Sequence, residues 1–467
     1  GHPPGAPLFM VIGRLFSFFA APENVAVWMN RLSGLSSSFS ILFMFWSITM
    51  LGKKIISVRK PELSVGDQIA ILGSSFVGAL AYTFSESFWF SAVEGEVYAM
   101  ASLFTAIIFW AILKWDEEMG LRNANKLAEN IYPDRWLLLI LFLLGLAIGV
   151  HLLGILVVPA IGYVIYFRYH ETITLKWFIL TGLISILVLG FIQEGVIPGT
   201  VALASSIEVM FKNSLGLPFY AGTFFFFAVI VAAAVYFIRR ARKNGNTLMY
   251  NITMGMILLL IGYGSFAVIV IRSNANTPLD ENDPENLVTL HAYLKREQYG
   301  SNPILFGQQW NSKTNPQAEW KDRSPFYLRR FVVTKNDIDV KGFKSEVAAN
   351  AFAKELGGGA SVDEKYFESN ADSRKYQVAT YEQSVFFPRM YWSATDDGKV
   401  NGYKRWSGYD PSEDAGTEIG SDGQRLPSFG ENMQYFFRYQ VNWMYVRYFM
   451  WNFAGRQNDI QGHGDQM

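Results

Sequence analysis

The feature that most constrains this chain is a series of long apolar segments within its first 271 residues. The hydrocarbon core of a bilayer is about 30 Å thick, so a helix that crosses it needs about 20 mostly apolar residues. The segments fall approximately at Phe39–Val58, Gln68–Phe90, Val97–Leu113, Trp136–Val150, Leu152–Phe167, Trp177–Ile192, Phe219–Ile238 and Met249–Ile271. We therefore predict an all-α polytopic membrane protein with about eight spans.

The stretch from Trp136 to Phe167 is ambiguous, because it could form one tilted helix or two short helices joined near His151 and Gly154. Lys and Arg concentrate on the cytoplasmic side of membrane proteins. All four basic clusters can lie on that side only if this stretch crosses twice, so we predict two helices. The clusters are Lys53, Lys54, Arg59 and Lys60; Lys114, Arg122, Lys126 and Arg135; Arg168 and Lys176; and Arg239, Arg240, Arg242 and Lys243.

The composition divides the chain into three parts. Residues 1–35 contain two short apolar patterns, Leu8–Ala20 and Glu23–Leu35, which we interpret as outer interfacial helices of a first exocytoplasmic loop. A frayed N-terminal arm is the alternative. Residues 36–272 form the transmembrane domain. Residues 273–467 are rich in Asn, Asp, Pro, Gly and Lys, which indicates an irregular, mixed α/β exocytoplasmic region.

Charge and cysteine content exclude several kinds of function. Forty basic and forty acidic residues cancel, so the chain has no overall field of the kind that attracts nucleic acid. The sequence has no cysteine, which excludes disulfides, thiol nucleophiles and thiolate metal sites. We expect no metal and no organic cofactor.

Seven polar residues stand near the predicted outer ends of the spans. Such residues are costly at membrane depth, and each is therefore a functional candidate. They are Glu86, Glu94, Glu96, His151, Gln193, Glu194 and Glu208. The structural alternatives are solvated acids in an aromatic belt and a hydrogen-bonded histidine at a helix junction.

The end of the chain interleaves aromatic residues with Arg438, Arg447 and Arg456. An arginine can pair bidentately with a phosphate, so this segment suits a surface that lies against lipid headgroups. An aromatic-rich core helix with solvated arginines is the alternative.

Several of these segments together resemble a known family. They are the opening His2–Phe9 (HPPGAPLF), the segment Trp89–Tyr98 that ends in EVY, His151, and the closing Arg447–Asp459 (RYFMWNFAGRQND). The chain is similar, over nearly its whole length, to the bacterial membrane proteins catalogued as domain of unknown function 2723. These are related to protein O-mannosyltransferases of the GT-C glycosyltransferase superfamily.

The resemblance implies a GT-C-like fold and a glycosyltransferase of the bacterial inner (cytoplasmic) membrane, with the region after residue 272 outside the cytoplasm. The donor would be a sugar, such as mannose, on a polyprenyl-phosphate carrier, and the acceptor a Ser or Thr hydroxyl of an exported protein. The family's catalytic acid belongs to an Asp-Gly-Glu type motif that precedes HPPG, so we expect it upstream of Gly1. The residues that would bind substrate are His2, Glu94, Glu96, His151, Arg438, Arg447, Arg456 and Asp459.

Two other functions compete with this hypothesis. A non-catalytic structural or assembly subunit of an envelope complex would need no catalytic acid, and it would make a larger membrane complex the partner. A transporter would use acids and a histidine for proton coupling, which requires polar residues at mid-depth of the membrane rather than only at its edge.

Overall fold

The computed structural model describes residues 5–60, 62–275, 277–278, 280–295, 302–315, 319–322, 325–370, 375–378, 380–392, 397–410, 416–419 and 424–454. The chain forms two compact units. The first unit comprises Gly1–Arg296 and Tyr327–Phe367, and the second comprises Glu297–Phe326 and Glu368–Met467. The first unit continues past residue 272, where the composition changes.

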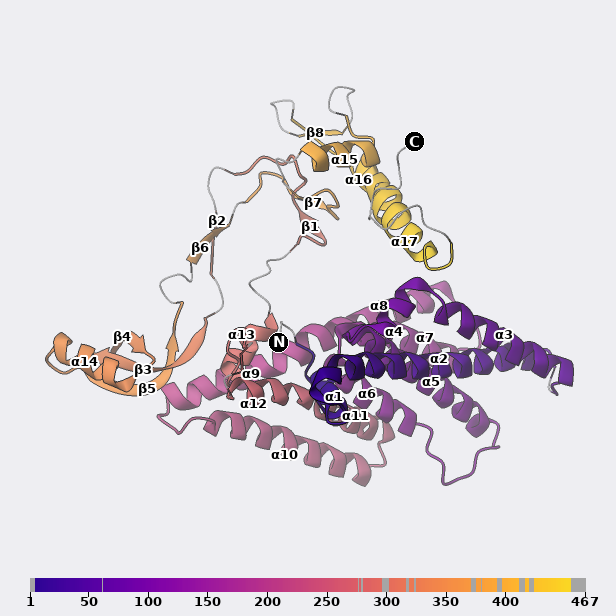
Figure 1. The fold of residues 1–467 in the computed structure, drawn as a ribbon, viewed down its shortest axis with the longest axis horizontal. Helices are drawn as coiled ribbons and strands as arrows, with labels where there is room; N and C mark the ends of the chain where they lie inside the picture. Colours follow the sequence, from indigo (N-terminus) through magenta and orange to yellow (C-terminus); the bar gives the residue numbers. More distant parts are fainter. Residues whose placement is uncertain are drawn as a thin grey trace. The chain divides into compact units, whose positions relative to one another are not determined.

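The first unit is a bundle of helices, drawn from indigo to salmon in Figure 1. The part of the chain that the structure describes contains seven helical segments long and apolar enough to cross a membrane. This confirms the prediction of a polytopic helical membrane protein. The helices are α1 (Pro7–Ser17), η1 (Pro22–Asn24), α2 (Val25–Ser57), α3 (Val65–Thr83), α4 (Glu86–Val93), α5 (Val97–Asn123), α6 (Arg135–Ile148), η2 (Leu152–Val157), α7 (Val158–Tyr169), α8 (Leu175–Gly190), the π-helical η3 (Phe191–Val196), α9 (Ile197–Asn213), α10 (Ala221–Lys243), α11 (Thr247–Tyr263), η4 (Gly264–Phe266), α12 (Ala267–Ser273) and α13 (Leu287–Lys295).

The ambiguous stretch forms two helices, as predicted. Helix α6 is an apolar helix of 14 residues, and the chain breaks at His151 before η2 and α7. Arg135, the first residue of α6, donates to Glu118 near the end of α5 at 2.8 Å. Arg168, near the end of α7, donates from Nε to Asp116 at 2.6 Å. The start of α6 and the end of α7 thus contact the same part of α5. The two helices therefore form a hairpin that turns at His151.

The basic clusters gather at one end of the bundle, which we call the basic end. Lys54 contacts Asp116 at 2.5 Å, as Arg168 does from the other side. Helix α10 ends four residues before α11, whose Asn251 donates to Asp134 beside α6 at 2.7 Å. The α10 cluster therefore lies at this end too. The His151 turn marks the opposite end, which we call the His151 end.

Glycines bring α6 and α11 into close contact. A Cβ on Gly145 would lie 2.2 Å from the carbonyl oxygen of Leu259, and one on Gly262 would lie 2.6 Å from that of Phe142. Small residues let helix backbones approach closely in membrane proteins. Around this crossing, Ile112, Leu144 and Leu259 are buried in the core that α5, α6 and α11 share.

The N-terminal helices differ in part from the prediction. Helix α1 forms within Leu8–Ala20, but Glu23–Leu35 is not a separate interfacial helix, because α2 continues without interruption to Ser57. No proline interrupts it after Pro22, so nothing stops the helix at Leu35. At 33 residues and about 1.5 Å per residue, α2 is about 50 Å long and exceeds the bilayer core. The predicted span Gln68–Phe90 is likewise divided, between α3 and α4.

A small sheet also belongs to the first unit. Strands β3 (Tyr327–Lys335), β4 (Ile338–Phe343) and β5 (Ser361–Glu368) pair in the order β4-β3-β5, and α14 (Glu346–Leu356) packs against β3 and β4. Asn336 and Asp337 have φ values of 52° and 61°, which suits the tight turn of a hairpin. On the helical side, the Nδ2 of Asn213 donates to the carbonyl of Tyr366 in β5 at 2.7 Å.

The second unit is mixed α/β, in agreement with the prediction. Its strands form three antiparallel pairs, β1–β7, β2–β6 and β8–β9. Helix α16 (Phe429–Tyr435) begins with a capping box between Ser428 and Glu431. The elements are β1 (Phe306–Gly307), β2 (Glu319–Asp322), β6 (Lys375–Val378), β7 (Val385–Phe386), α15 (Asp397–Ser407), β8 (Thr417–Ile419), β9 (Gln424–Leu426), α16 (Phe429–Tyr435), the π-helical η8 (Phe436–Val446) and α17 (Arg447–Met450).

Candidate functional site

His151 lies at the turn of the α6–α7 hairpin. Its backbone is extended (φ −162°, ψ 142°), and its Nδ1 accepts a hydrogen bond from the backbone N–H of Leu153 at 3.1 Å. The neutral ring must therefore carry its proton on Nε2, which remains available as a donor. Burial lowers the pKa of His151 and favours this neutral form.

Tyr98 stands beside His151, with the two ring centroids 5.3 Å apart. It lies in the first turn of α5, directly after the turn that carries Glu94 and Glu96. The N–H of Glu96 donates to the carbonyl of Glu94 at 2.8 Å, and both side chains are exposed. A Cβ on Gly95 would lie 3.2 Å from Oδ1 of Asn30, so this turn packs against the beginning of α2.

Helix α1 is fixed to the same place. The N–H of Leu8 donates to the carbonyl of Gly149 at 2.8 Å, two residues before His151. A Cβ on Gly149 would lie 2.2 Å from Oγ of Ser265 and 3.2 Å from Cβ of Leu8, so only glycine fits between α1 and η4 without displacement. Phe9 of α1 is buried in the small core with Met100. The His151 turn, α1 and the start of α5 thus form one packed site.

A groove of about 420 Å³ extends from this site along α2 and α5. Tyr98, which stands beside His151, and Leu153 are among the residues that line it. Several hydroxyl groups project into an otherwise apolar lining. Those of Ser40, Ser47 and Thr105 each donate to the carbonyl four residues earlier, at 2.8, 2.8 and 3.0 Å. The lining residues are Ser40, Met44, Ser47, Ile48, Leu51, Tyr82, Tyr98, Ala101, Ser102, Thr105, Ala106, Phe109 and Leu153.

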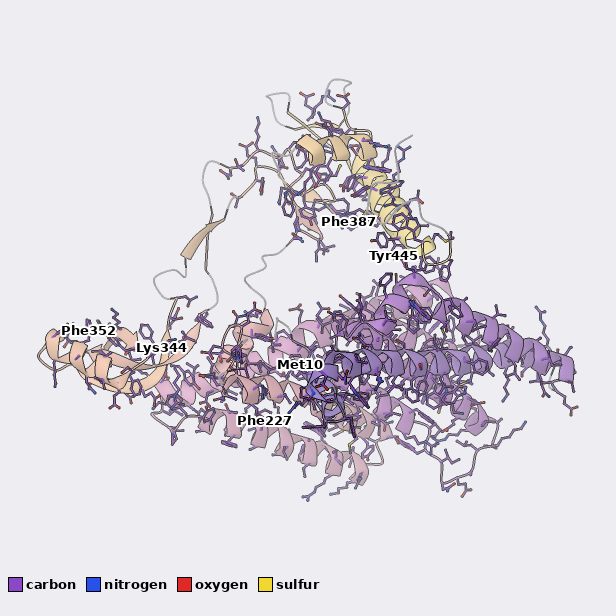
Figure 2. All side chains as sticks on the ribbon, viewed as in Figure 1. Met10, Phe227, Lys344, Phe352, Phe387 and Tyr445 are labelled. Carbon is purple, nitrogen blue, oxygen red and sulfur yellow. The ribbon has the colours of Figure 1, made fainter. Side chains whose placement is uncertain are left out.

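A second cavity, of about 870 Å³, lies between α1, α12 and the residues that follow α12. Met10, labelled in Figure 2, is one of the α1 residues that line it. Arg14 and Arg272 bring two guanidinium groups to its wall, and Asp280 and Glu281 bring two carboxylates. The cavity has both charges required to orient a polar substrate next to an apolar surface.

Three of the predicted substrate-binding residues, Glu94, Glu96 and His151, lie at the His151 end of the first unit. Arg438 and Arg447 belong to the second unit. His2, Arg456 and Asp459 lie outside the described residues.

The two described arginines of the second unit have different environments. Arg438 is exposed. The guanidinium of Arg447 stacks between Trp443 and Trp451, at 3.8 and 4.5 Å from the ring centroids, and its Nε donates to the carbonyl of Trp443 at 2.9 Å. Its Nη1 and Nη2 are buried and have no hydrogen-bond partner among the described residues.

Among the other polar candidates, Glu208 is structural. Its carboxylate is buried and accepts hydrogen bonds from the N–H groups of Tyr220 and Thr223 at the start of α10. Gln193 and Glu194 are exposed in η3, and Glu86 lies in the first turn of α4. In the described residues, no group of three or more His, Cys, Asp or Glu is placed to hold a metal ion.

The sequence interpretation missed the hydroxyl face of α2. Ser33, Ser36, Ser40 and Ser47 are buried on one side of this helix, at intervals of three, four and seven residues. That spacing is readable in the sequence, because residues three, four and seven apart share a helix face. Arg14 and Arg272 were missed for a different reason, since only the tertiary structure places them in one cavity.

The site lies within a region that resembles a known domain. Residues 1–174, which include α1 to α7, match the family model described as the protein O-mannosyl-transferase TMEM260 N-terminal domain. Residues 300–437 match a family of unknown function, DUF8416. No curated protein and no solved structure matches the chain. The helical first part of the chain is thus similar to an O-mannosyltransferase domain.

Proposed function

We propose that the protein is a membrane glycosyltransferase of the GT-C type, which transfers mannose from a polyprenyl-phosphate carrier to Ser or Thr hydroxyls of exported proteins. The His151 end would face the outside of the bacterial inner membrane. The observation that carries the proposal is the groove that begins at Tyr98, beside His151, within the region similar to an O-mannosyltransferase domain.

The groove suits the lipid part of such a donor. Its lining is mainly apolar, as an isoprenoid chain requires, and the hydroxyl groups of Ser40, Ser47 and Thr105 donate to backbone carbonyls. The carrier phosphate would then lie at the His151 end, next to Nε2–H of His151 and the hydroxyl of Tyr98. Donors placed where negative charge develops stabilise the transition state.

The reaction is an inverting displacement at the anomeric carbon. A carboxylate base takes the proton of the acceptor hydroxyl, whose oxygen forms a bond to the anomeric carbon. The bond from that carbon to the phosphate oxygen breaks, and the polyprenyl phosphate leaves with the electron pair. We assign His151 and Tyr98 to the departing phosphate, and exposed Glu94 and Glu96 to positioning of the acceptor.

The distribution of charge also supports a reaction at the membrane surface rather than proton-coupled transport. Between Arg31 and Lys53 of α2, and between Glu96 and Lys114 at α5, the sequence has no charged residue. Transport coupled to protons would require ionisable groups at that depth.

The test is a transfer assay with the protein in liposomes, polyprenyl-phosphate [³H]mannose and a Ser/Thr-rich peptide, read by mass spectrometry of the peptide. His151→Ala should lower kcat/KM by about a hundredfold, the usual cost of one such donor. Thr105→Trp should raise the KM for the carrier, because the indole fills the groove. His170→Ala is the matched control, since His170 lies at the end of α7 near the basic end.

Two results would contradict the proposal. One is a His151→Ala variant that transfers mannose as fast as the wild type. The other is a folded wild-type protein that transfers no sugar, which would favour the role of a structural subunit.

A further inference from the structure

The cations at the basic end are not equally compensated. Lys53 and Lys114 pair with Glu117, and Lys54 and Arg168 pair with Asp116. Arg135 pairs with Glu118. The cluster at the end of α10 differs: Arg239, Arg240 and Lys243 are exposed, and no described carboxylate pairs with them. Arg59, Arg122, Lys126 and Lys176 are also exposed without a described carboxylate partner, so the α10 cluster is distinguished by the apolar groove beside it rather than by its charge alone.

One face of α10 lines an apolar groove of about 690 Å³. Its residues there recur at intervals of three and four, from Thr223 through Phe227 to Ile238. Phe227, labelled in Figure 2, and Val231 are half or more exposed. The opposite wall comes mainly from α11 and α12, including Ile257, Leu260, Ile261, Ala267 and Ile271.

The groove leads to the unpaired cations. Val235 lines both the groove and a neighbouring depression of about 750 Å³, whose other residues include Tyr236, Arg239, Arg240 and Lys243. An apolar channel thus continues directly into a basic surface.

From this continuity we propose that the surface formed by α10 and α11 at the basic end binds an anionic phospholipid. The phosphate of the lipid pairs with Arg239 and Lys243, and one acyl chain lies in the groove against Val235, Ile257 and Ile261. Basic pockets between transmembrane helices bind anionic headgroups in this manner. The inference is independent of the transfer reaction, because the cations that would bind the phosphate lie at the end of the bundle opposite His151.

The length of the groove fits one chain. From Ile238 back to Thr223 the helix rises about 22 Å, which exceeds one leaflet of a core about 30 Å thick, so a whole acyl chain can lie along the groove. Arg240 is less suited to the phosphate, because its Nη1 already donates to the hydroxyl of Tyr236 at 3.1 Å. Arg239 and Lys243, one turn apart, face the same depression.

The experiment measures lipid retained by the full chain in native mass spectrometry after exchange with phosphatidylglycerol or phosphatidylcholine. The double variant Arg239→Gln/Lys243→Gln should bind phosphatidylglycerol about thirtyfold more weakly, since each basic residue near an anionic lipid contributes about a fivefold gain. Its binding of phosphatidylcholine should not change. Ala234→Trp, which fills the groove, should weaken the binding of both lipids.

The matched control, Arg122→Gln/Lys126→Gln, removes two exposed cations at the same end that do not line the groove or the depression. This variant should retain phosphatidylglycerol like the wild type. Equal losses in the two double variants would overturn the proposal in favour of a general field. Equal retention of the two lipids by the wild type would also overturn it. So would a dimer that excludes lipid adducts, because a second copy would then cover the groove.

Discussion

Tyr366 of β5 donates its hydroxyl hydrogen to Oε1 of Glu208 on α9 at 3.3 Å. The same carboxylate accepts from the N–H groups of Tyr220 at 2.6 Å and Thr223 at 2.9 Å, so it also caps the first turn of α10. One buried side chain thus connects the small sheet to two helices of the bundle. This arrangement makes Glu208 a structural centre, although its sequence position suggested a functional acid.

Replacing Glu208 with Ala should lower the stability of this region by about 3 kcal/mol, because it leaves buried donors at the start of α10 without an acceptor. The measurement is hydrogen exchange of the amides of α10 and β5, together with the thermal midpoint in detergent. Tyr366→Phe is the milder control, since it removes one hydrogen bond and should cost about 1 kcal/mol. Equal effects of the two changes would contradict the central role of Glu208.

The attachment of β5 should weaken at alkaline pH. Burial, with the nearby charge of Glu208, raises the pKa of Tyr366 above its ordinary value. Above about pH 10 the unfolded chain loses the tyrosine proton while the folded chain keeps it, so stability falls as pH rises. The protection of the β5 amides, relative to the exchange rate of the unfolded chain, should therefore fall above about pH 10 in the wild type. Tyr366→Phe should remove that part of the fall, and an unchanged alkaline profile in the variant would exclude Tyr366 as its source.

Asp116 should be essential to the basic end. Its side chain is only 6% exposed and contacts both Lys54 and Arg168, the latter 18% exposed. Asp116→Ala would leave Arg168 mostly buried without its carboxylate partner, a change that costs about 3 kcal/mol. The thermal midpoint in detergent should fall markedly. The control is Lys60→Ala, which breaks the pair between Lys60 and Asp67. Because Lys60 is 60% exposed, this change should leave the midpoint unchanged. Similar midpoints for the two variants would show that the Asp116 cluster does not stabilise the bundle.

His151 should respond to acid. Because burial lowers its pKa, the folded chain binds its proton at lower pH than the unfolded chain does. The neutral form of His151 therefore contributes its full share of folding stability above about pH 6.5. That share is lost as the pH falls toward the pKa of His151 in the folded chain. Protonation also removes the acceptor of the Leu153 N–H, which should loosen the turn before η2. An NMR titration of the ring should show a midpoint below about 6.5.

His151→Asn gives the matching variant, because Asn also accepts a backbone N–H as a helix N-cap but does not titrate. In this variant, acid should no longer increase the hydrogen exchange of the backbone amides of Leu153 and its neighbours. If the variant still shows that transition, another group controls the turn.

The sequence determined the membrane class of this protein, because apolar runs of bilayer length that alternate with basic loops have few other physical solutions. It also predicted the break at His151, since all four basic clusters can lie on one side of the membrane only if the chain crosses twice in this stretch. The mixed α/β character after residue 272 followed from composition. These are local or one-dimensional properties, which periodicity and charge can report.

Other features depended on contacts between distant residues. The sequence could not tell that Glu208 caps α10, because its partners lie 12 to 158 positions away. It predicted a separate helix over Glu23–Leu35, whereas the absence of a helix breaker lets α2 extend to Ser57. It suggested Arg447 as a phosphate ligand, whereas the described contacts of its guanidinium include stacking on two tryptophans.

The sequence by itself thus identified a multi-pass helical membrane protein and the polar residues that stand beside its apolar segments. Only the tertiary structure decided which of those residues meet. Tyr98, which follows the turn of Glu94 and Glu96, meets His151 because α1, α5 and the α6–α7 hairpin pack at Gly149, where any larger side chain would collide with Leu8 and Ser265. A hydrophobic pattern fixes the face of a helix, but the choice of neighbour depends on the shapes that fit against it.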